Sequence, residues 1–455
     1  MTSATENPRS SFMHGSWRGA LARVMWHAHP AHPGPEYARL RESQWWSAEQ
    51  IAEFQVQQFR ELMETAQKVP FYRERFAAAG VGSGDIKSLA DIARVPILER
   101  GDMERLGIEG LKVPGSWGVK ASSSGSLGKR VHFLWPLSQM RWLDAGEERA
   151  RTWLGSSVGS WRLEIRCRPV KLPQKIAAAL LNETAIHAPT MADPQVAQGI
   201  LKTLETRRPT MVWGVSNAMY TVAVALLEQG RTAPAKACWS GGNLLLPHYR
   251  KALEEAFQCP VYERYATMET GLIAHECLEG RSLHVPAEGL IAEIVRPDGS
   301  KAAPGETGEV LLTALRNHAT PLIRYRVGDR AIAPASERCS CGRGLPVFGT
   351  VIGRSRDFLK TPAGAMIGPR QAAEALRPVM DSSVVDFQVV QNAQGHLKIS
   401  ILQRDTPQAI ADREKVATII ADLVQPSERP EVERVNTIAL TPGGKLRTFI
   451  AHVEQ

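Results

Sequence analysis

Apolar residues recur at helical spacing in a segment near the N-terminus. Ser47-Ala-Glu-Gln50, just before it, has the pattern of a capping box. The apolar positions of the segment are Ile51, Phe54, Phe59, Leu62, Met63 and Ala66. We therefore predict a scaffold helix here. Residues 1–45 are rich in His, Pro, Arg and Ser at their start, and we expect a loosely ordered extension.

Between residues 115 and 350, short strand-like runs alternate with helical periodicity. Strands are expected at 131–135, 210–215, 290–295 and 309–313, and helices at 137–153, 218–229 and 249–257. This alternation predicts an α/β body with several subdomains.

The pattern changes after residue 357. Two strands, 384–390 and 397–402, flank an Asn-Ala-Gln-Gly turn, a helix is expected at 407–424, and a further strand at 434–440. We therefore predict a large domain over 46–356, and a small, mobile α+β domain over 357–455 joined to it by a hinge.

The composition is that of a globular protein, with 455 residues, 43% hydrophobic and 22% charged. No stretch approaches the roughly 20 apolar residues of a membrane span, and the first 40 residues lack the apolar core of a secretion signal. We expect a cytoplasmic protein, either a monomer or a homodimer. The net charge of +8 is spread along the chain, which fits anionic small substrates, and no nucleic-acid partner is expected.

The run Ser122-Ser-Ser-Gly-Ser-Leu-Gly-Lys-Arg130 is suited to binding phosphate. Glycine brings backbone N–H groups close to an anion, serine hydroxyls add donors, and Lys129 adds a charge. A solvated Ser/Gly turn is the alternative for an isolated match. The run is not a Walker loop, because two residues separate Gly125 from Gly128 and a strand follows. We call residues 122–130 the phosphate loop.

Four further segments follow the phosphate loop in order along the chain. They are Tyr265-Ala-Thr-Met-Glu269, Ile323-Arg-Tyr-Arg-Val-Gly-Asp329, Ile352-Gly-Arg-Ser-Arg-Asp357 and Gly443-Gly-Lys445. This order resembles the adenylate-forming superfamily of acyl-CoA ligases, most closely its phenylacetate-CoA ligase branch with the related capsule-biosynthesis proteins. The resemblance runs from Trp46 to about Arg447, and Lys68-Val-Pro-Phe-Tyr-Arg-Glu-Arg-Phe76 resembles the opening of that branch.

The resemblance implies an enzyme that uses ATP, Mg²⁺ and CoA. Its phosphate contacts would come from Ser123, Ser124, Gly125, Ser126, Gly128 and Lys129. Tyr265 would lie against the adenine, with Ala266, Thr267 and Met268 beside it, and Glu269 would bind magnesium. Asp329 would accept hydrogen bonds from the ribose hydroxyls, and Arg354 would contact the nucleotide. Asp357 would be the hinge, and Lys445 would stabilise charge during adenylation only.

Three positions depart from the family pattern. Leu127 replaces a threonine, Arg130 a proline, and Ala266 the glycine after the tyrosine. None of these changes removes a charge that the mechanism needs, although phosphate contacts and the adenine pocket differ in detail.

Cysteine and histidine residues suggest a separate metal site. Cys277, His284, Cys339 and Cys341 form a soft ligand set for structural zinc, with His275 as an alternative to His284. Cys339-Ser-Cys-Gly-Arg-Gly-Leu-Pro346 resembles a cysteine-bearing segment of relatives thought to carry zinc. Three reduced cysteines packed as small hydrophobic residues are the alternative. The other cysteines, Cys167, Cys238 and Cys259, are expected to be inert core residues.

By analogy with the family, the acyl pocket would lie near two strand ends, and an aryl or arylacetic acid is the expected substrate. Its residues would be Trp213, Gly214, Ser240, Gly241 and Gly242, with the glycines permitting close approach of a flat ring. Trp213 and Trp239 fit a packed core equally well.

The leading functional hypothesis is an AMP-forming acid–CoA ligase. A second is an adenylating enzyme that passes the acyl group to an amine or carrier protein, or a nucleotidyl group to a hydroxyl. A third is a non-catalytic, zinc-stabilised nucleotide-binding protein. Retention of Glu269, Asp329, Arg354 and Lys445 argues against the third.

Overall fold

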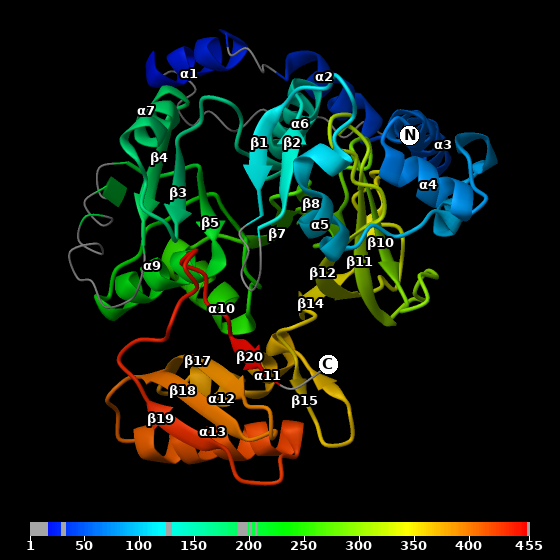
Figure 1. The fold of residues 1–455 in the computed structure, drawn as a ribbon. Helices are drawn as coiled ribbons and strands as arrows, with labels where there is room; N and C mark the ends of the chain where they lie inside the picture. Colours follow the sequence, from blue (N-terminus) through cyan, green and yellow to red (C-terminus); the bar gives the residue numbers. More distant parts are fainter. Residues whose placement is uncertain are drawn as a thin grey trace.

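The computed structural model describes residues 17–28, 33–123, 130–188, 199, 203–204 and 207–452. A large body, blue to yellow in Figure 1, lies above a smaller C-terminal part drawn in orange and red. Residues 124–129 of the phosphate loop lie outside the described residues, so that only Ser122, Ser123 and Arg130 of this loop are placed.

Helices form the N-terminal side of the body. They are α1 (Trp17–Ala28), α2 (Gly34–Ser43), α3 (Ala48–Ala66), α4 (Pro70–Ala78) and α5 (Arg100–Leu111). The predicted helix after Ser47 is confirmed as α3, whose Ser47 and Gln50 form a reciprocal capping box. The expectation of a loosely ordered extension is wrong for residues 34–45. Leu40 is buried there, and buried Ser43 donates a hydrogen bond to Glu288.

An eight-stranded sheet is the centre of the body. Its order is β13-β9-β8-β7-β6-β5-β3-β4. The strands are β3 (Arg162–Arg166), β4 (Glu183–His187), β5 (Met211–Val215), β6 (Ala237–Gly241), β7 (Val261–Thr267), β8 (Gly271–Glu276), β9 (Leu283–His284) and β13 (Val347–Phe348). The five strands from β4 to β7 are parallel, and β8, β9 and β13 are added antiparallel.

Alternate residues of the buried strands face helices on both sides of this sheet. Met211, Ala237 and Trp239 pack against α6 (Leu137–Trp153). Val212, Cys238 and Val261 pack on the other face, against α9 (Ser216–Glu228) and α10 (Pro247–Phe257). Helix α7 (Leu172–Leu180) connects β3 to β4 and lies at the outer edge of the sheet.

Two smaller sheets complete the body. A hairpin pairs β1 (Val119–Ser122) with β2 (His132–Trp135), on either side of the phosphate loop. A four-stranded antiparallel sheet has the order β10-β11-β12-β14, with strands β10 (Leu290–Val295), β11 (Thr307–Ala314), β12 (Tyr325–Ile332) and β14 (Thr350–Arg354). The predicted helix 137–153 and strand 290–295 match to the residue, and the other predicted elements of the body shift by no more than two residues.

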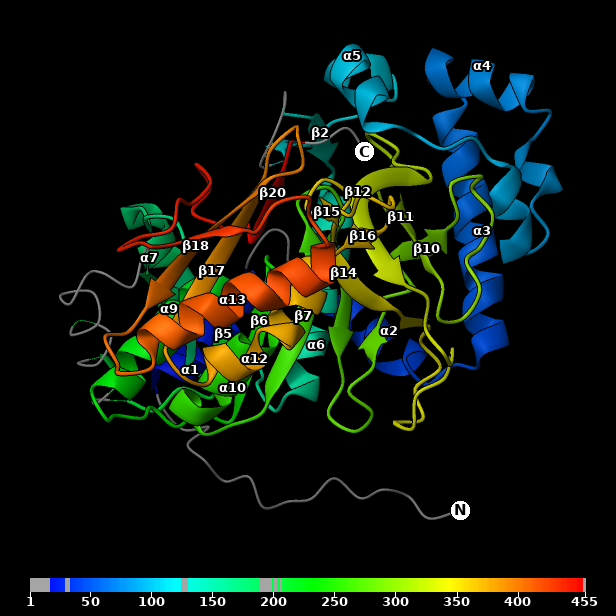
Figure 2. The same cartoon turned by 90° about the horizontal axis from the view of Figure 1, so that it is seen from below.

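The C-terminal part has its own sheet, in the order β19-β18-β17-β20. Its elements are β15 (Leu359–Lys360), β16 (Met366–Ile367), α11 (Pro369–Ala375), α12 (Arg377–Met380), β17 (Val384–Gln391), β18 (Leu397–Gln403), α13 (Ala409–Val424), β19 (Glu431–Arg434) and β20 (Phe449–Ala451). Helix α13 lies across one face of this sheet (Figure 2).

The predicted strand at 434–440 is wrong. The strand is β19, which pairs with β18 only as far as Arg434. Beyond it the chain leaves the sheet and crosses to the body, as the red loop in Figure 1 shows, before it returns as β20. A strand-like composition was therefore overridden by the path of the chain.

Side chains from both parts meet in one apolar cluster between α9, α10 and the C-terminal sheet. At its edge, the Tyr220 hydroxyl donates to the Val385 carbonyl at 2.5 Å, and the Tyr249 hydroxyl donates to Asp386 at 2.7 Å. In the part of the chain that the structure describes, no helix is long and apolar enough to span a bilayer.

Candidate functional site

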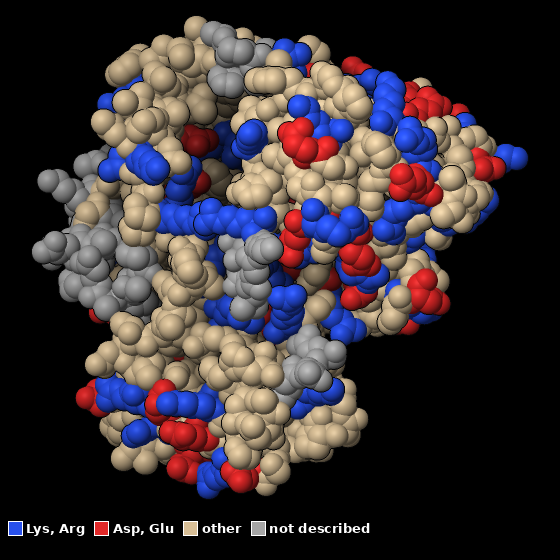
Figure 3. All heavy atoms as spheres, in the orientation of Figure 1, with Lys and Arg blue, Asp and Glu red and all other residues tan. Residues whose placement is uncertain are grey.

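A cavity of about 800 Å³ lies between the body and the C-terminal part. Nine basic and seven acidic side chains line it among the described residues. Figure 3 shows Lys and Arg side chains gathered around the centre of this face, where the two parts meet. The excess of positive charge suits a polyanionic ligand.

Strand β7 and the turn after it bring Tyr265 and Glu269 to the cavity. The Tyr265 ring stacks on Phe348 with centroids 5.7 Å apart, and its hydroxyl donates to Asp329 Oδ2 at 2.6 Å. Ala266, Thr267 and the half-exposed Met268 line the same wall. Phe348 was not predicted from the sequence, because a lone aromatic residue in a two-residue strand carries no signal.

The pairing of β12 with β14 places Asp329 directly opposite Arg354. Arg354 Nε lies 3.6 Å from Asp329 Oδ1. Burial raises the pKa of Asp329, and Arg354 and the Tyr265 hydroxyl act in the opposite direction. Three of the predicted segments therefore converge, because neighbouring antiparallel strands and a side-chain hydrogen bond connect them.

Glu269 is buried at the floor of the cavity, with 6% of its surface exposed. Burial raises the pKa of its carboxyl group, while the Arg100 guanidinium lowers it. Arg100 also reaches towards Ser123, with Nη2 3.5 Å from Ser123 Oγ. Sequence reasoning missed Arg100, since it opens helix α5 outside every recognisable motif.

A loop from the C-terminal part, Thr441–Arg447, enters the cavity from the other side; we call it the lysine loop. Side chains of the body hold three of its carbonyl groups. Cys167 and Arg168 donate to the Gly443 carbonyl at 3.1 and 3.2 Å, Asn217 to that of Gly444 at 3.2 Å, and Asn243 to that of Leu446 at 3.1 Å. Cys167 is therefore more than the inert core residue that we expected.

This docking requires glycine at position 444. Gly444 has a φ of 76°, and a Cβ there would lie 2.1 Å from the Cys167 carbonyl oxygen. The neighbouring Lys445 points its Nζ towards Gly242, 3.9 Å from the position that a Cβ of Gly242 would take. Burial lowers the pKa of Lys445, and so does the Arg354 guanidinium.

Asp357, the predicted hinge residue, has a specific partner on the lysine loop. Arg447 places Nη2 2.6 Å and Nε 3.0 Å from Asp357 Oδ1. Burial raises the pKa of Asp357, and Arg447 opposes that shift. The prediction stressed backbone freedom at this position and missed the ion pair, because 90 residues separate the partners in sequence.

Of the residues proposed for the acyl pocket, Gly242 lines the cavity. Gly214 and Gly241 instead lie against the backbones of neighbouring strands, and Ser240 is buried with its hydroxyl bonded to Ser216. Trp213 and Trp239 stack on Arg151 within the body. One face of α6 lines the cavity in their place, with Met140, Leu143, Asp144 and Glu147 at helical spacing.

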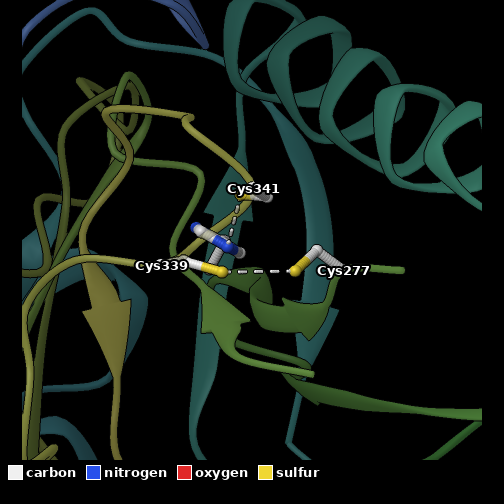
Figure 4. A group of neighbouring side chains, drawn as sticks. Cys277, Cys339 and Cys341 are labelled. Atoms are coloured by element: carbon white, nitrogen blue, oxygen red, sulfur yellow. Dashed lines mark hydrogen bonds between the residues drawn. The ribbon is translucent and has the colours of Figure 1, made fainter. Parts of the chain in front are cut away.

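The four predicted zinc ligands lie together at the far end of the eight-stranded sheet (Figure 4). Their ligand atoms all fall within 4.8 Å of one another. Cys277 Sγ is 3.5 Å from Cys339 Sγ, and Cys341 Sγ is 3.4 Å from His284 Nε2. His275 is not in this cluster; its ring packs on Trp153. The pairing of β9 with β13 selects His284, since it places this histidine beside the segment that follows Cys341.

Comparisons with known proteins agree with this architecture. Protein CapK of Staphylococcus aureus is 24% identical over 432 residues, covering 92% of each chain. The phenylacetate-coenzyme A ligase of Thermus thermophilus is 24% identical, covering 84% of this chain and 92% of its own. The phenylacetate-coenzyme A ligase of Escherichia coli is 25% identical, covering 77% of this chain and 81% of its own. A scan against protein-family models finds no match.

Among solved structures, 2-hydroxyisobutyryl-CoA ligase in the postadenylation state superposes with a TM-score of 0.72 at 18% identity, covering 88% of this chain and 89% of that one. The chain therefore has the fold of this CoA ligase, and its sequence is similar to CapK and to phenylacetate-coenzyme A ligases. That ligase in its thioesterification state gives a TM-score of 0.60. The two parts of this chain are therefore arranged more as in the postadenylation structure.

Replacing Gly444 with alanine should undock the lysine loop. The added Cβ meets the Cys167 backbone, which cannot give way as a side chain does, and the positive φ adds strain. We expect faster amide hydrogen exchange at Gly444 and Thr441, whose N–H groups are hydrogen-bonded within the loop.

Gly443→Ala is the matched control, since its Cβ would meet only the end of the Arg168 side chain. Its exchange should change little. Equal acceleration in both variants would show that the fit of Gly444 against Cys167 does not hold the loop.

Proposed function

We propose that the protein is an AMP-forming ligase that activates a carboxylic acid with ATP and transfers the acyl group to CoA. The observation that carries this proposal is the meeting of Lys445, from the C-terminal part, with Glu269, Asp329 and Arg354 in one cavity. Similarity to phenylacetate-CoA ligases over most of the chain supports it.

We assign the nucleotide to the wall formed by β7, β12 and β14. Tyr265 offers an aromatic surface to the adenine and is supported from behind by Phe348, and Ala266, Thr267 and Met268 lie beside it. Asp329 accepts hydrogen bonds from the ribose hydroxyls. Each carboxylate oxygen can accept two hydrogen bonds, so the carboxylate can bind these hydroxyls while it also accepts the bond from Tyr265. Ser123, Ser124, Gly125, Ser126, Gly128 and Lys129 would hold the phosphates, with Arg100 beside Ser123.

Glu269 fits a magnesium ligand. It offers carboxylate oxygens to the cavity, which Thr267 also lines, and hard oxygen donors suit this ion. When bound, Mg²⁺ would neutralise charge on the phosphate oxygens.

In the first half-reaction, a carboxylate oxygen of the acid attacks the α-phosphorus of ATP. The bond from this phosphorus to the bridging oxygen breaks, and pyrophosphate leaves with that electron pair. Lys445 Nζ faces Gly242, and the Arg354 guanidinium is near enough to lower the pKa of this amine; from there its charge would bridge the carboxylate and the α-phosphate. In the second half-reaction, the CoA thiol loses its proton to solvent and its sulfur attacks the acyl carbon. The bond from this carbon to the phosphate oxygen breaks, and AMP leaves with that electron pair.

Lys445 is needed for the first step alone, so the C-terminal part must move between the steps. We propose that residues 357–455 move as a unit about Asp357. The movement would break the hydrogen bonds that Cys167, Arg168, Asn217 and Asn243 donate to the lysine loop. These contacts would hold the adenylation arrangement.

The acid is proposed to lie between Gly242 and the cavity face of α6. Trp135, Met140 and Leu143 provide apolar surface for an aryl or arylacetic group, and Gly242 leaves space for a flat ring. Asp144 and the ion pair of Glu147 with Arg264 lie at the same wall. This wall therefore favours a ring with a polar substituent over a plain hydrocarbon.

Lys445→Ala should stop adenylation and spare thioester formation. We expect the rate of pyrophosphate release with ATP and an aryl acid to fall by about a hundredfold or more, since a preorganised charge is lost. Thioester formation from supplied acyl-adenylate and CoA should remain within about threefold of wild type.

The same assay identifies the class of molecule that accepts the acyl group. Adenylate that hydroxylamine traps, without CoA thioester from the wild-type protein, would favour transfer to an amine or a carrier protein. An unchanged adenylation rate in Lys445→Ala would contradict the mechanism.

The adenylation rate should also decline at high pH. The charged amine of Lys445 is the active form, and its pKa is lowered by burial and by Arg354. The charge is thus lost as pH rises through a value below that of a free lysine, about 10.4. The adenylation rate of Lys445→Arg should not change with pH over this range, because a guanidinium group stays charged. A wild-type decline that Lys445→Arg reproduces would assign it to another group.

We further propose that Cys277, His284, Cys339 and Cys341 hold a structural Zn²⁺. Tetrahedral zinc with bonds of about 2.3 Å to sulfur and about 2.0 Å to nitrogen separates its ligand atoms by about 3.5 to 3.8 Å. The separations of 3.5 and 3.4 Å are close to these values. His284 Nδ1 faces the Leu345 carbonyl at 3.3 Å, which leaves Nε2 for the metal.

Cys277→Ser should lose the zinc that the purified wild-type protein contains by elemental analysis. It should also lower the free energy of unfolding by about 4 kcal/mol or more, the range of a lost metal site. Cys259→Ser, also buried but packed in a different apolar cluster from Cys277, is the control and should retain zinc. Wild-type protein without zinc, and stable towards chelators, would support the reduced-cysteine alternative.

A further inference from the structure

Helices α1 and α7 carry large apolar side chains on their outer surfaces. Trp17, Leu21 and Val24 of α1 are 71%, 40% and 62% exposed, and Leu172 and Ile176 of α7 are 70% and 54% exposed. Leu180 and Leu181 add 37% each. Seven of the fourteen exposed large hydrophobic side chains among the described residues therefore belong to this region.

These residues form stripes, because their spacing places them on one side of each helix. Trp17, Leu21 and Val24 are separated by four and three positions, and Leu172, Ile176 and Leu180 by four each. The two helices lie against each other at the edge of the body (Figure 1). We call the seven exposed residues together the α1–α7 face. A helix of a globular body normally turns its apolar stripe inwards.

The charge around this face has one sign. No acidic residue occurs between positions 7 and 35 or between 165 and 182, whereas Arg18, Arg23, Lys171 and Lys175 accompany the stripes. The Arg18 guanidinium lies over the exposed Trp17 ring, 5.4 Å from its centroid. In Figure 3 the upper left region, where α1 and α7 lie, is mainly tan with blue side chains at its border.

We propose that the α1–α7 face docks on the surface of an anionic lipid bilayer. The apolar stripes enter the boundary between headgroups and acyl chains, and the basic side chains contact the headgroups. A paired Trp and Arg suits this boundary, because the indole and the guanidinium each combine an apolar body with a polar edge.

Charge complementarity selects this partner over a second copy of the chain. Two α1–α7 faces brought together would oppose basic side chains to basic side chains, which is unfavourable at a desolvated interface. An anionic bilayer offers the opposite charge together with an apolar layer. The acids nearest in sequence to α7 do not offset the basic charge, since Glu164 pairs with Arg166 and Glu183 pairs with Arg162.

The test is co-sedimentation of the full chain with phosphatidylcholine vesicles that contain about 30% phosphatidylglycerol, compared with pure phosphatidylcholine vesicles. We expect binding to the anionic vesicles that weakens as salt increases. The double variant Leu172→Gln with Ile176→Gln should bind at least about tenfold more weakly. Lys171→Gln with Lys175→Gln should lose the preference for anionic lipid.

Ile410→Gln is the matched control. Ile410 is an isoleucine on helix α13, 71% exposed, and it lies outside the α1–α7 face. Its substitution should leave vesicle binding unchanged.

Three outcomes overturn the proposal. They are no binding of the wild-type chain to either vesicle, equal binding by wild type and both α7 variants, and a dimer at micromolar concentration that Leu172→Gln with Ile176→Gln dissociates. The assay contains no ATP, acid or CoA. A failure of the proposed ligase activity therefore leaves this result untouched, and the reverse also holds.

Discussion

The site depends on hydrogen bonds between side chains of the body and the backbone of the lysine loop. Lys445 belongs to a part of the chain with its own sheet, yet its amine lies among carboxylates and guanidinium groups of the body. The body binds three backbone carbonyl groups of the loop through the side chains of Cys167, Arg168, Asn217 and Asn243. These bonds do not depend on the side chains of the loop, because every residue has a backbone carbonyl group. What restricts the sequence is space, since only glycine at position 444 allows the loop to approach the Cys167 backbone. Such contacts fix the position of the lysine while leaving its side chain free to act.

Buried charges are the second constraint, because Asp329 and Glu269 are buried and Lys445 is half-buried beside them. Burial shifts the pKa of each group towards its neutral form, and neighbouring groups oppose the shift for both carboxylates. Arg354 is shared between these effects: it stabilises the Asp329 carboxylate and lowers the pKa of Lys445. A bound polyanion would raise the pKa of Lys445 again, because it places negative charge beside the amine. The charged form of Lys445 is therefore favoured most when an anionic ligand occupies the cavity.

Sequence reasoning succeeded where the signal is local. The capping box at Ser47 and the periodicity of 137–153 are local, and α3 and α6 follow them. The segments that carry Tyr265, Asp329 and Arg354 could be recognised from a resemblance, and the pairing of β12 with β14 brings two of them together. Partners distant in sequence were missed: Arg100, Phe348 and the pair of Asp357 with Arg447. The acyl-pocket glycines could not be resolved, because whether a glycine faces a cavity or a neighbouring strand depends on packing that only folding creates.

The packing that brings the C-terminal part against the body also opposes the separation of these two parts. Tyr220 and Tyr249 donate hydrogen bonds across the interface to Val385 and Asp386, and an apolar cluster continues between them. In the proposed mechanism, rotation of the C-terminal part would have to break these bonds together with those of the lysine loop, and would expose apolar surface to water. The arrangement in this structure would therefore be a stable resting state of the proposed ligase, and leaving it would require new contacts of similar strength in the second arrangement. In that mechanism, consumption of ATP would supply the trigger, because departure of pyrophosphate removes negative charge beside Lys445 and so weakens the attraction that holds its amine in the cavity.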